Sequence, residues 1–468
     1  MRSESHPFMP SSLESNKREM LDAIGANGID DLYEQIPDRL MYDGDLDLPG
    51  PTGEMEVKRN TERILAKNTT CEENSNFLGA GCWQHYVPAV CEEIIQRREF
   101  LTSEWGSPES DKGRNQAWFE FKSQLGELLD LEAVGMPVYS WGNASAFAMR
   151  MAHRLNGRTE VLVPETISPE RLSVMRNYST LSNSPENLTI ETIPYDRESG
   201  EMDLDRLEDA CSEDTAAVYF ETPTYLGTIE SQGAAIAEVA HENGAECIAG
   251  VDPITLGLLE SPANLGADIV VGTTQTLGLS MKAGGSCGGF IATRDEEQYV
   301  VEYPTLLLSA TATAEEGELG YAFMPEQLHR SSYGLREAGN DFTGTSVFLY
   351  TIANAVYMSL LGPRGFEEVG DLTIRNAHYA AEQLAAIDGV DVLLTDGFFK
   401  EFVVNFDGVE PSASEVNDAL RDRGIFGGKP LEDEFPDLGD SALYCVTEVH
   451  TKAELDTLAT AVSEVVSS

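Results

Sequence analysis

One acidic residue stands where a buried strand is expected to end. Residues 245–252 are mostly apolar and close on Asp252, and a second apolar run, 269–272, follows the tripeptide 266–268. In α/β folds, functional side chains lie just beyond the carboxyl ends of the sheet strands, so this carboxylate is placed at the mouth of a sheet. A carboxylate there can keep the ring nitrogen of pyridoxal phosphate protonated, which makes the ring an electron sink. An Asp that only caps the following turn is the alternative, and the spacing does not choose between the two.

A second group of polar side chains stands where a helix is expected to begin. The run Val138-Tyr139-Ser140-Trp141-Gly142-Asn143-Ala144-Ser145 leads into an apolar segment, and Asn143 or Ser145 is a candidate cap. The free N–H groups of such a helix start suit a phosphate, and fold-type-I pyridoxal phosphate enzymes place the cofactor phosphate there. A cap with nothing bound is the favoured alternative, because a phosphate-binding turn usually contains more glycine.

The elements that must position these groups follow a regular alternation. Strands are expected at residues 160–164, 188–193, 216–221 and 245–252, with helices at 169–178, 203–210 and 233–243 between them. Strands that alternate with helices of about ten residues indicate βαβ units. The sequence therefore predicts an α/β fold with a mostly parallel sheet.

Three regions are expected along the chain. Residues 1–75 read as a polar N-terminal arm with a short helix at 16–25, and they have too little apolar surface to fold alone. Residues 76–361 form the large α/β domain. The Gly362-Pro363 pair marks a boundary, and residues 362–468 are expected to form a small C-terminal α+β domain with strands at 390–394, 401–406 and 443–449.

Composition excludes several classes of protein. The chain has 468 residues, with 80 acidic and 31 basic side chains and a net charge of −49. Nonspecific nucleic-acid binding requires many Lys and Arg residues, so we expect no nucleic-acid partner. The acidic excess is spread along the chain, which favours a halophilic surface over an ordinary acidic one. No long apolar run or signal peptide is evident, so we expect no membrane span and a cytoplasmic location. The seven scattered cysteines indicate neither a metal site nor a disulfide framework.

An ordered set of motifs resembles a known family. Phe77-Leu78-Gly79-Ala80-Gly81, His85-Tyr86-Val87-Pro88, Val251-Asp252-Pro253-Ile254 and the run 266–272 recur in the same order in subunit 1 of the split glycine decarboxylase, the P-protein of the glycine cleavage system. The resemblance covers essentially the whole chain. It implies the fold-type-I, aspartate-aminotransferase-like fold of pyridoxal phosphate enzymes, in a diverged member of haloarchaeal type.

The lysine that would carry the cofactor is missing. A fold-type-I enzyme holds pyridoxal phosphate as a Schiff base on a Lys after this part of the sheet. The position eight residues after Asp268 holds Thr276, and the preceding Gln275 agrees with the family's first subunit. The resemblance therefore implies that a partner subunit holds the cofactor. Lys282 is an alternative Schiff-base lysine, but we favour an ordinary loop lysine because six extended residues span on the order of 20 Å.

The resemblance also implies a function and partners. The family reaction is the pyridoxal phosphate-dependent decarboxylation of glycine, with transfer of the aminomethyl group to the lipoylated H-protein. The chain would act in a hetero-oligomer with a lysine-bearing subunit 2. Its cofactor-site residues would be His85, Asn143, Ser145, Asp252 and Gln275.

Two stretches depart from the family pattern. Ser103-Glu104-Trp105-Gly106-Ser107-Pro108-Glu109 replaces Thr-Pro-Tyr-Gln-Pro-Glu, and the Lys after Arg336-Glu337 is absent. A non-catalytic paralogue that keeps only the fold and the partner surface, or a stand-alone enzyme using Lys282, are therefore the alternatives.

Overall fold

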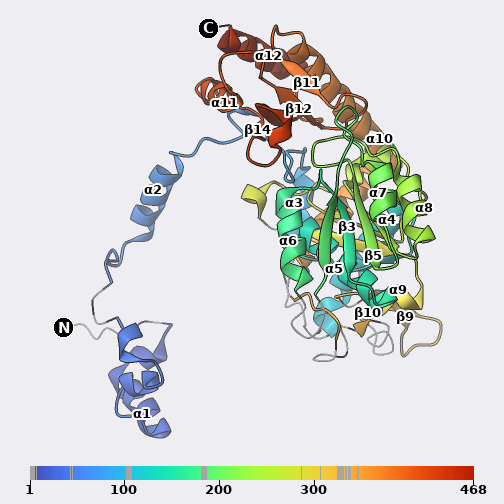
Figure 1. Ribbon diagram of the computed structural model, residues 1–468. Helices are drawn as coiled ribbons and strands as arrows, with labels where there is room; N and C mark the ends of the chain where they lie inside the picture. Colours follow the sequence, from blue (N-terminus) through green and yellow to red (C-terminus); the bar gives the residue numbers. More distant parts are fainter. Residues whose placement is uncertain are drawn as a thin grey trace. The chain divides into compact units, whose positions relative to one another are not determined.

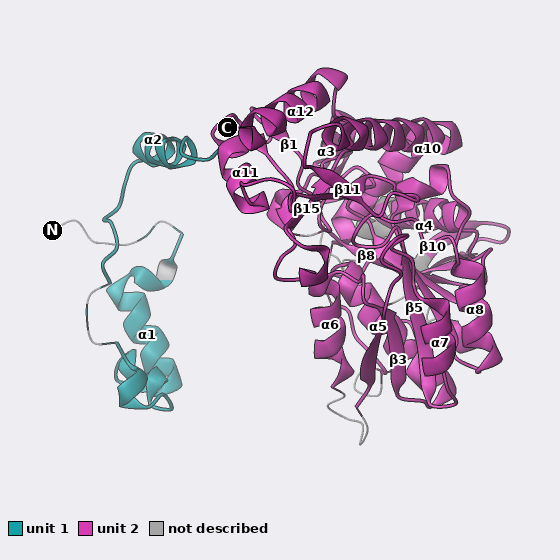
Figure 2. Ribbon diagram, turned by 45° about the horizontal axis from the view of Figure 1, so that its top comes forward, with its two compact units in different colours: residues 1–69 teal, residues 70–468 magenta. Residues whose placement is uncertain are grey.

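The computed structural model describes the chain in two compact units, residues 1–69 and 70–468 (Figure 2). The described residues are 6, 8–42, 44, 46–101, 108–180, 187–285, 287–305, 307–323, 331–332, 335, 339–344 and 347–467. The expected end of the N-terminal arm, residue 75, lies six residues beyond the first unit, and the expected boundary at 362 lies inside the second. The expected division into large and small domains stays a prediction.

The first unit contains two helices. Helix α1 (Glu14–Ile24) ends at Gly25, whose φ of +74° suits glycine, so the predicted short helix is confirmed. Helix α2 (Glu54–Leu65) begins after Gly53 and was not predicted. None of the described residues of this unit is buried. No described helix of the chain is long and apolar enough to cross a bilayer.

A seven-stranded sheet forms the centre of the second unit, in the order β2-β8-β7-β6-β5-β3-β4. Figure 1 labels two of its strands, β3 and β5. The five strands from β7 to β4 pair in parallel, as predicted, and β8 runs antiparallel to β7 and β2. The bounds are β2 Ala133–Val134, β3 Glu160–Pro164, β4 Thr189–Ile193, β5 Thr215–Thr222, β6 Glu246–Val251, β7 Ile269–Thr273 and β8 Gly289–Thr293.

The two faces of this sheet build two separate cores, because successive strand residues point to opposite sides. Val218 and Phe220 of β5 pack in one core, whereas Ala217 and Tyr219 pack in the other. The inner strands β5, β6 and β7 are covered on both faces, which explains why they are mostly apolar, whereas the edge strand β4 is largely exposed. The helices that cover them are α4 Pro108–Leu129, α5 Trp141–Asn156, α6 Pro169–Ser179, α7 Leu204–Ala210 and α8 Gly233–Glu242.

Helix α10 (Phe348–Ala385) connects the central sheet to the C-terminal part of the chain. It is kinked at Gly362, whose φ is +58°, and Pro363 follows inside the helix. Proline removes a backbone hydrogen bond and breaks helical geometry, so the pair that predicts a boundary produces a bend within one long helix.

The C-terminal part contains a four-stranded antiparallel sheet, in the order β11-β12-β15-β14, which we call the C-terminal sheet. With its helices it matches the predicted α+β arrangement. Ser412 and Thr451 form capping boxes with Glu415 and Glu454 at the starts of the two helices after α10. The bounds are β11 Asp391–Leu393, β12 Glu401–Asn405, β14 Lys429–Pro430, β15 Ser441–Cys445, α11 Ala413–Arg421 and α12 Lys452–Val466.

Several short elements lie outside the two larger sheets. The segment after the first unit begins with β1 (Ser75–Asn76), which pairs in parallel with β13 (Ile425–Phe426), and α3 (Ala89–Ile95) follows it. The acidic stretch 310–320 contributes to a hairpin of β9 (Leu308–Ala312) and β10 (Leu319–Phe323). The two strands are held by backbone hydrogen bonds, and the charge and composition of the segment do not predict such pairing.

Candidate active site

Asp252 lies at the carboxyl end of β6, as predicted, and is 1% exposed. One carboxylate oxygen accepts hydrogen bonds from the backbone N–H of Ile254 at 3.2 Å and from the hydroxyl of Thr276 at 2.9 Å. The other oxygen accepts from the ammonium of Lys400 at 2.5 Å. Asp252 therefore caps the following turn, η4 (Pro253–Gly257), and also holds a buried cation.

Lys400 is the residue that sequence analysis missed. It immediately precedes β12 of the C-terminal sheet and is 2% exposed. Its ammonium lies 3.7 Å from the ring centroid of Trp83 and 3.1 Å from Nε2 of His85. One feature of the sequence could have indicated Lys400: it directly precedes an apolar strand, β12, where a lysine is rare unless it is paired.

The charges around Lys400 act together on Asp252. Burial alone would raise the pKa of the Asp252 carboxyl, but the Lys400 ammonium and His85 outweigh burial and hold that pKa below its usual value. The carboxylate is therefore charged, and the pair is a buried ion pair.

His85 extends this contact to a second carboxylate. Its Nδ1 lies 2.7 Å from Glu448, and the backbone N–H of Tyr86 donates to the other Glu448 oxygen at 2.7 Å. Burial works against the charge of Glu448, but His85 and these hydrogen bonds lower its pKa to about 2. His85 therefore lies between the two groups, with Nδ1 facing Glu448 and Nε2 facing the Lys400 ammonium.

Gln275 fixes the backbone of the loop that carries Trp83. Its side-chain oxygen accepts from the backbone N–H of Trp83 at 3.2 Å. Its side-chain NH₂ group donates to the backbone carbonyls of Trp83 at 2.9 Å and Leu279 at 3.1 Å. Gln275 is 1% exposed. It thus places the indole ring against Lys400 without touching Lys400 itself.

Asn143 and Ser145 lie at the start of α5, but neither caps it. The cap is Ser140, whose hydroxyl accepts from the Asn143 N–H at 3.1 Å, because the helix begins earlier than expected, at Trp141. The Asn143 side-chain oxygen accepts from the Tyr139 N–H, and the Ser145 hydroxyl donates to the Trp141 carbonyl and to the Tyr219 hydroxyl.

A second buried ion pair lies beside the first. Both oxygens of Glu221 accept from the Arg171 guanidinium at 2.7 Å, and Tyr219 donates to Glu221 at 2.7 Å. The guanidinium also stacks on Trp141, 4.3 Å from the ring centroid. Burial works against the charge of Arg171, but Glu221 outweighs it and raises the Arg171 pKa.

The two pairs leave almost no space between them. A cavity of about 10 Å³ is lined by residues of both clusters and of the loop after β5: Trp83, Trp141, Arg171, Pro223, Thr224, Tyr225, Gly227, Asp252, Lys400 and Glu401. That is room for about one water molecule. Gly227 belongs to this close packing, because a Cβ there would stand 1.9 Å from the Glu401 carbonyl oxygen.

The alternative lysine lies elsewhere. Lys282 is exposed, and its ammonium stands 3.5 Å from the ring centroid of Tyr350. The two departures from the family pattern fall largely outside the described residues, since positions 103–107 and 336–338 are not among them.

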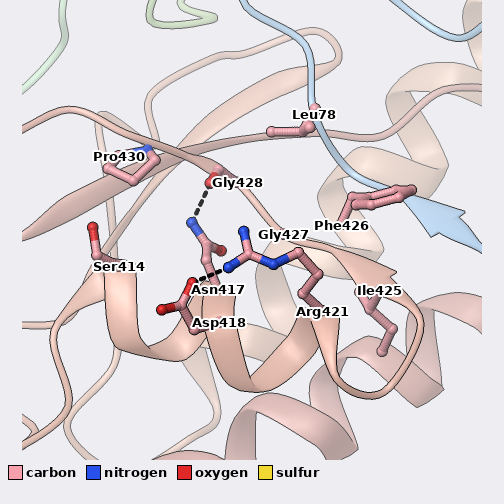
Figure 3. A pocket seen from close by; sticks show the side chains of 10 residues that line it. All are labelled: Leu78, Ser414, Asn417, Asp418, Arg421, Ile425, Phe426, Gly427, Gly428 and Pro430. Carbon is pink, nitrogen blue, oxygen red and sulfur yellow. Dashed lines mark hydrogen bonds and ion pairs between the residues drawn. The ribbon is translucent and has the colours of Figure 1, made fainter. Parts of the chain in front are cut away.

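A larger cavity on the C-terminal part offers no comparable chemistry. It measures about 250 Å³ and lies between α11 and residues 425–430, with Leu78 at its edge (Figure 3). Asn417 donates to the Gly428 carbonyl at 2.6 Å and Arg421 pairs with Asp418, whereas the Asn417 side-chain oxygen is buried without a hydrogen-bond partner.

Comparison with known proteins places the chain among its relatives. Residues 7–462 match the family described as glycine cleavage system P-protein. The chain belongs to this family. The predicted resemblance is thereby confirmed over nearly the whole length.

Individual relatives agree along their full length. The chain is 34% identical to the probable glycine dehydrogenase (decarboxylating) subunit 1 of Staphylothermus marinus, over 99% of each chain. It is 36% identical to the protein of the same description from Saccharolobus solfataricus, over 99% of this chain and 98% of that one.

Solved structures confirm the predicted fold type I. A crystal structure of glycine decarboxylase (P-protein) of the glycine cleavage system, in inhibitor-bound form, superposes with a TM-score of 0.84 at 32% identity and covers 99% of this chain and 100% of that one. The sphingosine-1-phosphate lyase of Burkholderia pseudomallei, at 16% identity, a TM-score of 0.64 and coverage of 92% and 95%, shares the fold alone.

The family implies pyridoxal phosphate, but this chain's own pocket does not fit it. Thr276, which the sequence predicts at the place of the fold-type-I lysine, donates its hydroxyl to Asp252. The carboxylate that would face a pyridine nitrogen faces Lys400 instead. The remaining cavity of about 10 Å³ is far too small for the cofactor. No cofactor chemistry is therefore assigned to these residues.

Proposed function

We propose that this chain is subunit 1 of a two-subunit glycine dehydrogenase (decarboxylating), and that a lysine-bearing subunit 2 of the same fold holds the pyridoxal phosphate. The observation that carries the proposal is the filled pocket, in which Lys400 and Thr276 occupy the surroundings of Asp252. A chain without room for a cofactor needs a partner that has one. The full-length similarity to relatives named subunit 1 supports the proposal that a second subunit holds the cofactor.

In this proposal the complex decarboxylates glycine and passes the aminomethyl group to the lipoylated H-protein. When bound in subunit 2, pyridoxal phosphate supplies the electron sink for loss of CO₂. This chain supplies the surface that closes the partner's pocket. His85, Asn143, Ser145 and Gln275 remain the predicted residues nearest that site; all four are buried, so they would act by holding their loops in place.

The first unit supports a hetero-oligomer. Its described residues include no buried side chain, yet many large apolar ones are exposed, among them Phe8, Met20, Ile24 and Met55. Exposed apolar side chains at this density mark an interaction surface. We infer that residues 1–69 bind the partner subunit and become ordered in its company.

The decisive experiment is reconstitution at high salt with subunit 2 from the same organism. The expected result is a stable complex in which exchange between glycine and labelled bicarbonate requires both chains and the H-protein. The matched control is this chain alone with pyridoxal phosphate, which after removal of free cofactor should retain no stoichiometric absorbance band and should show no exchange. A stable complex without exchange would support a non-catalytic paralogue, and a band from this chain alone that is lost in Lys282→Ala would support the stand-alone enzyme.

A further inference from the structure

The site around Lys400 is a complete receptor for one cation. The ammonium contacts a carboxylate oxygen of Asp252 at 2.5 Å, the imidazole of His85 at 3.1 Å and the indole face of Trp83 at 3.7 Å from the centroid. An anion, a lone pair and an aromatic face are the three groups that stabilise a desolvated cation. Trp83 and His85 come from one loop, and Asp252 comes from the end of β6.

This cation stands where fold-type-I enzymes hold a cofactor. The carboxylate at the end of the β6-type strand normally pairs with the pyridine nitrogen of pyridoxal phosphate, which is also a cation. Here Asp252 has its cationic partner within the chain. The ion pair has no access to solvent, since Lys400 is 2% and Asp252 1% exposed.

The surroundings show that the arrangement is built rather than incidental. Gln275 holds the backbone of Trp83 by two hydrogen bonds, and Glu448 holds His85, so both neutral contacts of the ammonium are themselves fixed. Thr276 and the backbone N–H of Ile254 donate to the Asp252 oxygen that does not face Lys400.

We propose that Lys400 is a permanent internal replacement for the cofactor cation, which closes this chain's own pocket and ties the C-terminal sheet to the end of β6. Lys400 is thus a positioning residue: it holds Asp252, Trp83 and His85 in place and takes no part in covalent chemistry. This role does not depend on whether the complex decarboxylates glycine.

The first test is chemical rescue. Lys400→Ala removes the atoms of a propylammonium ion and leaves the receptor intact. The expected result is a lowered melting temperature that rises saturably with propylammonium chloride, measured against potassium chloride at the same ionic strength. The wild-type chain and the Lys400→Ala/Asp252→Asn double variant should show no such rise. A folded Lys400→Ala chain that propylammonium does not stabilise, or an equal rise in all three, would overturn the proposal.

The second test uses the wild-type chain and so does not depend on the variant folding. The chain alone is incubated with pyridoxal phosphate and reduced with borohydride, and its lysines are mapped by mass spectrometry. Exposed lysines such as Lys282 should be modified, while Lys400 should remain unmodified. Stoichiometric modification of Lys400, or saturable binding of pyridoxamine phosphate to the chain, would mean that the pocket opens and would refute the proposal. Failure of glycine–bicarbonate exchange in the complex would count against the proposed function only.

Discussion

Replacing Lys400 by methionine tests the buried ion pair most directly. Lys400→Met keeps most of the side-chain volume but leaves the Asp252 carboxylate buried without its cation. Breaking a buried pair in this way costs about 3–5 kcal/mol. Asp252 retains its hydrogen bonds from Thr276 and Ile254, so we expect the lower end, a loss of about 3 kcal/mol in the free energy of unfolding at pH 7.

The pH dependence of that loss has a defined sign. In the wild-type chain the pKa of Asp252 lies below its ordinary 3.8, so its contribution to stability is present above pH 3.8 and is lost as pH falls through the lowered value. In Lys400→Met, burial without the ammonium raises the Asp252 pKa instead. The variant is therefore penalised most at neutral pH, and the difference from wild type narrows below about pH 4.

The assay is urea unfolding in molar potassium chloride at pH 7 and at pH 3.5. Two variants serve as comparisons. Lys400→Met/Asp252→Asn removes both charges and should recover at least half of the loss. Lys452→Met breaks an exposed pair with Asp456 and should cause no measurable change. A loss for Lys400→Met below about 1 kcal/mol, or an equal loss at both pH values, would refute the reasoning.

Three further predictions concern the neighbouring groups. Glu221→Gln should destabilise the chain by about 3 kcal/mol or more in urea unfolding, because it leaves the buried Arg171 guanidinium without its anion, and an unchanged midpoint would contradict this. The pKa of Glu448, lowered to about 2 beside His85, contributes stability that is present above pH 4.5 and is lost as pH falls towards 2; in an acid titration, Glu448→Gln should lose this pH dependence together with on the order of 2–3 kcal/mol at neutral pH. Deletion of residues 1–69 should leave the melting temperature of the second unit unchanged but abolish its co-elution with subunit 2 in size-exclusion chromatography, and co-elution of the shortened chain would argue that other surfaces suffice.

The sequence by itself determined the parallel sheet and the place of Asp252. Apolar runs alternating with amphipathic helices specify local structure, and a parallel sheet brings the ends of its strands to one edge. The family resemblance singled out Thr276 and Gln275 by their positions after Asp268. It did not predict their hydrogen-bond partners, Asp252 and Trp83.

Only the tertiary structure decided what Asp252 binds. Lys400 is 148 residues away in the sequence and Trp83 lies on a third segment, so no local pattern links them. Lys400 reaches Asp252 through contacts that span the whole second unit. β12 pairs in the C-terminal sheet, α10 bends at Gly362, and Gln275 hydrogen-bonds the backbone of Trp83. In the sequence, Lys400 cannot be told from a surface lysine, because its partner Asp252 is distant along the chain. Only the packing of the folded chain shows that Lys400 fills the pocket.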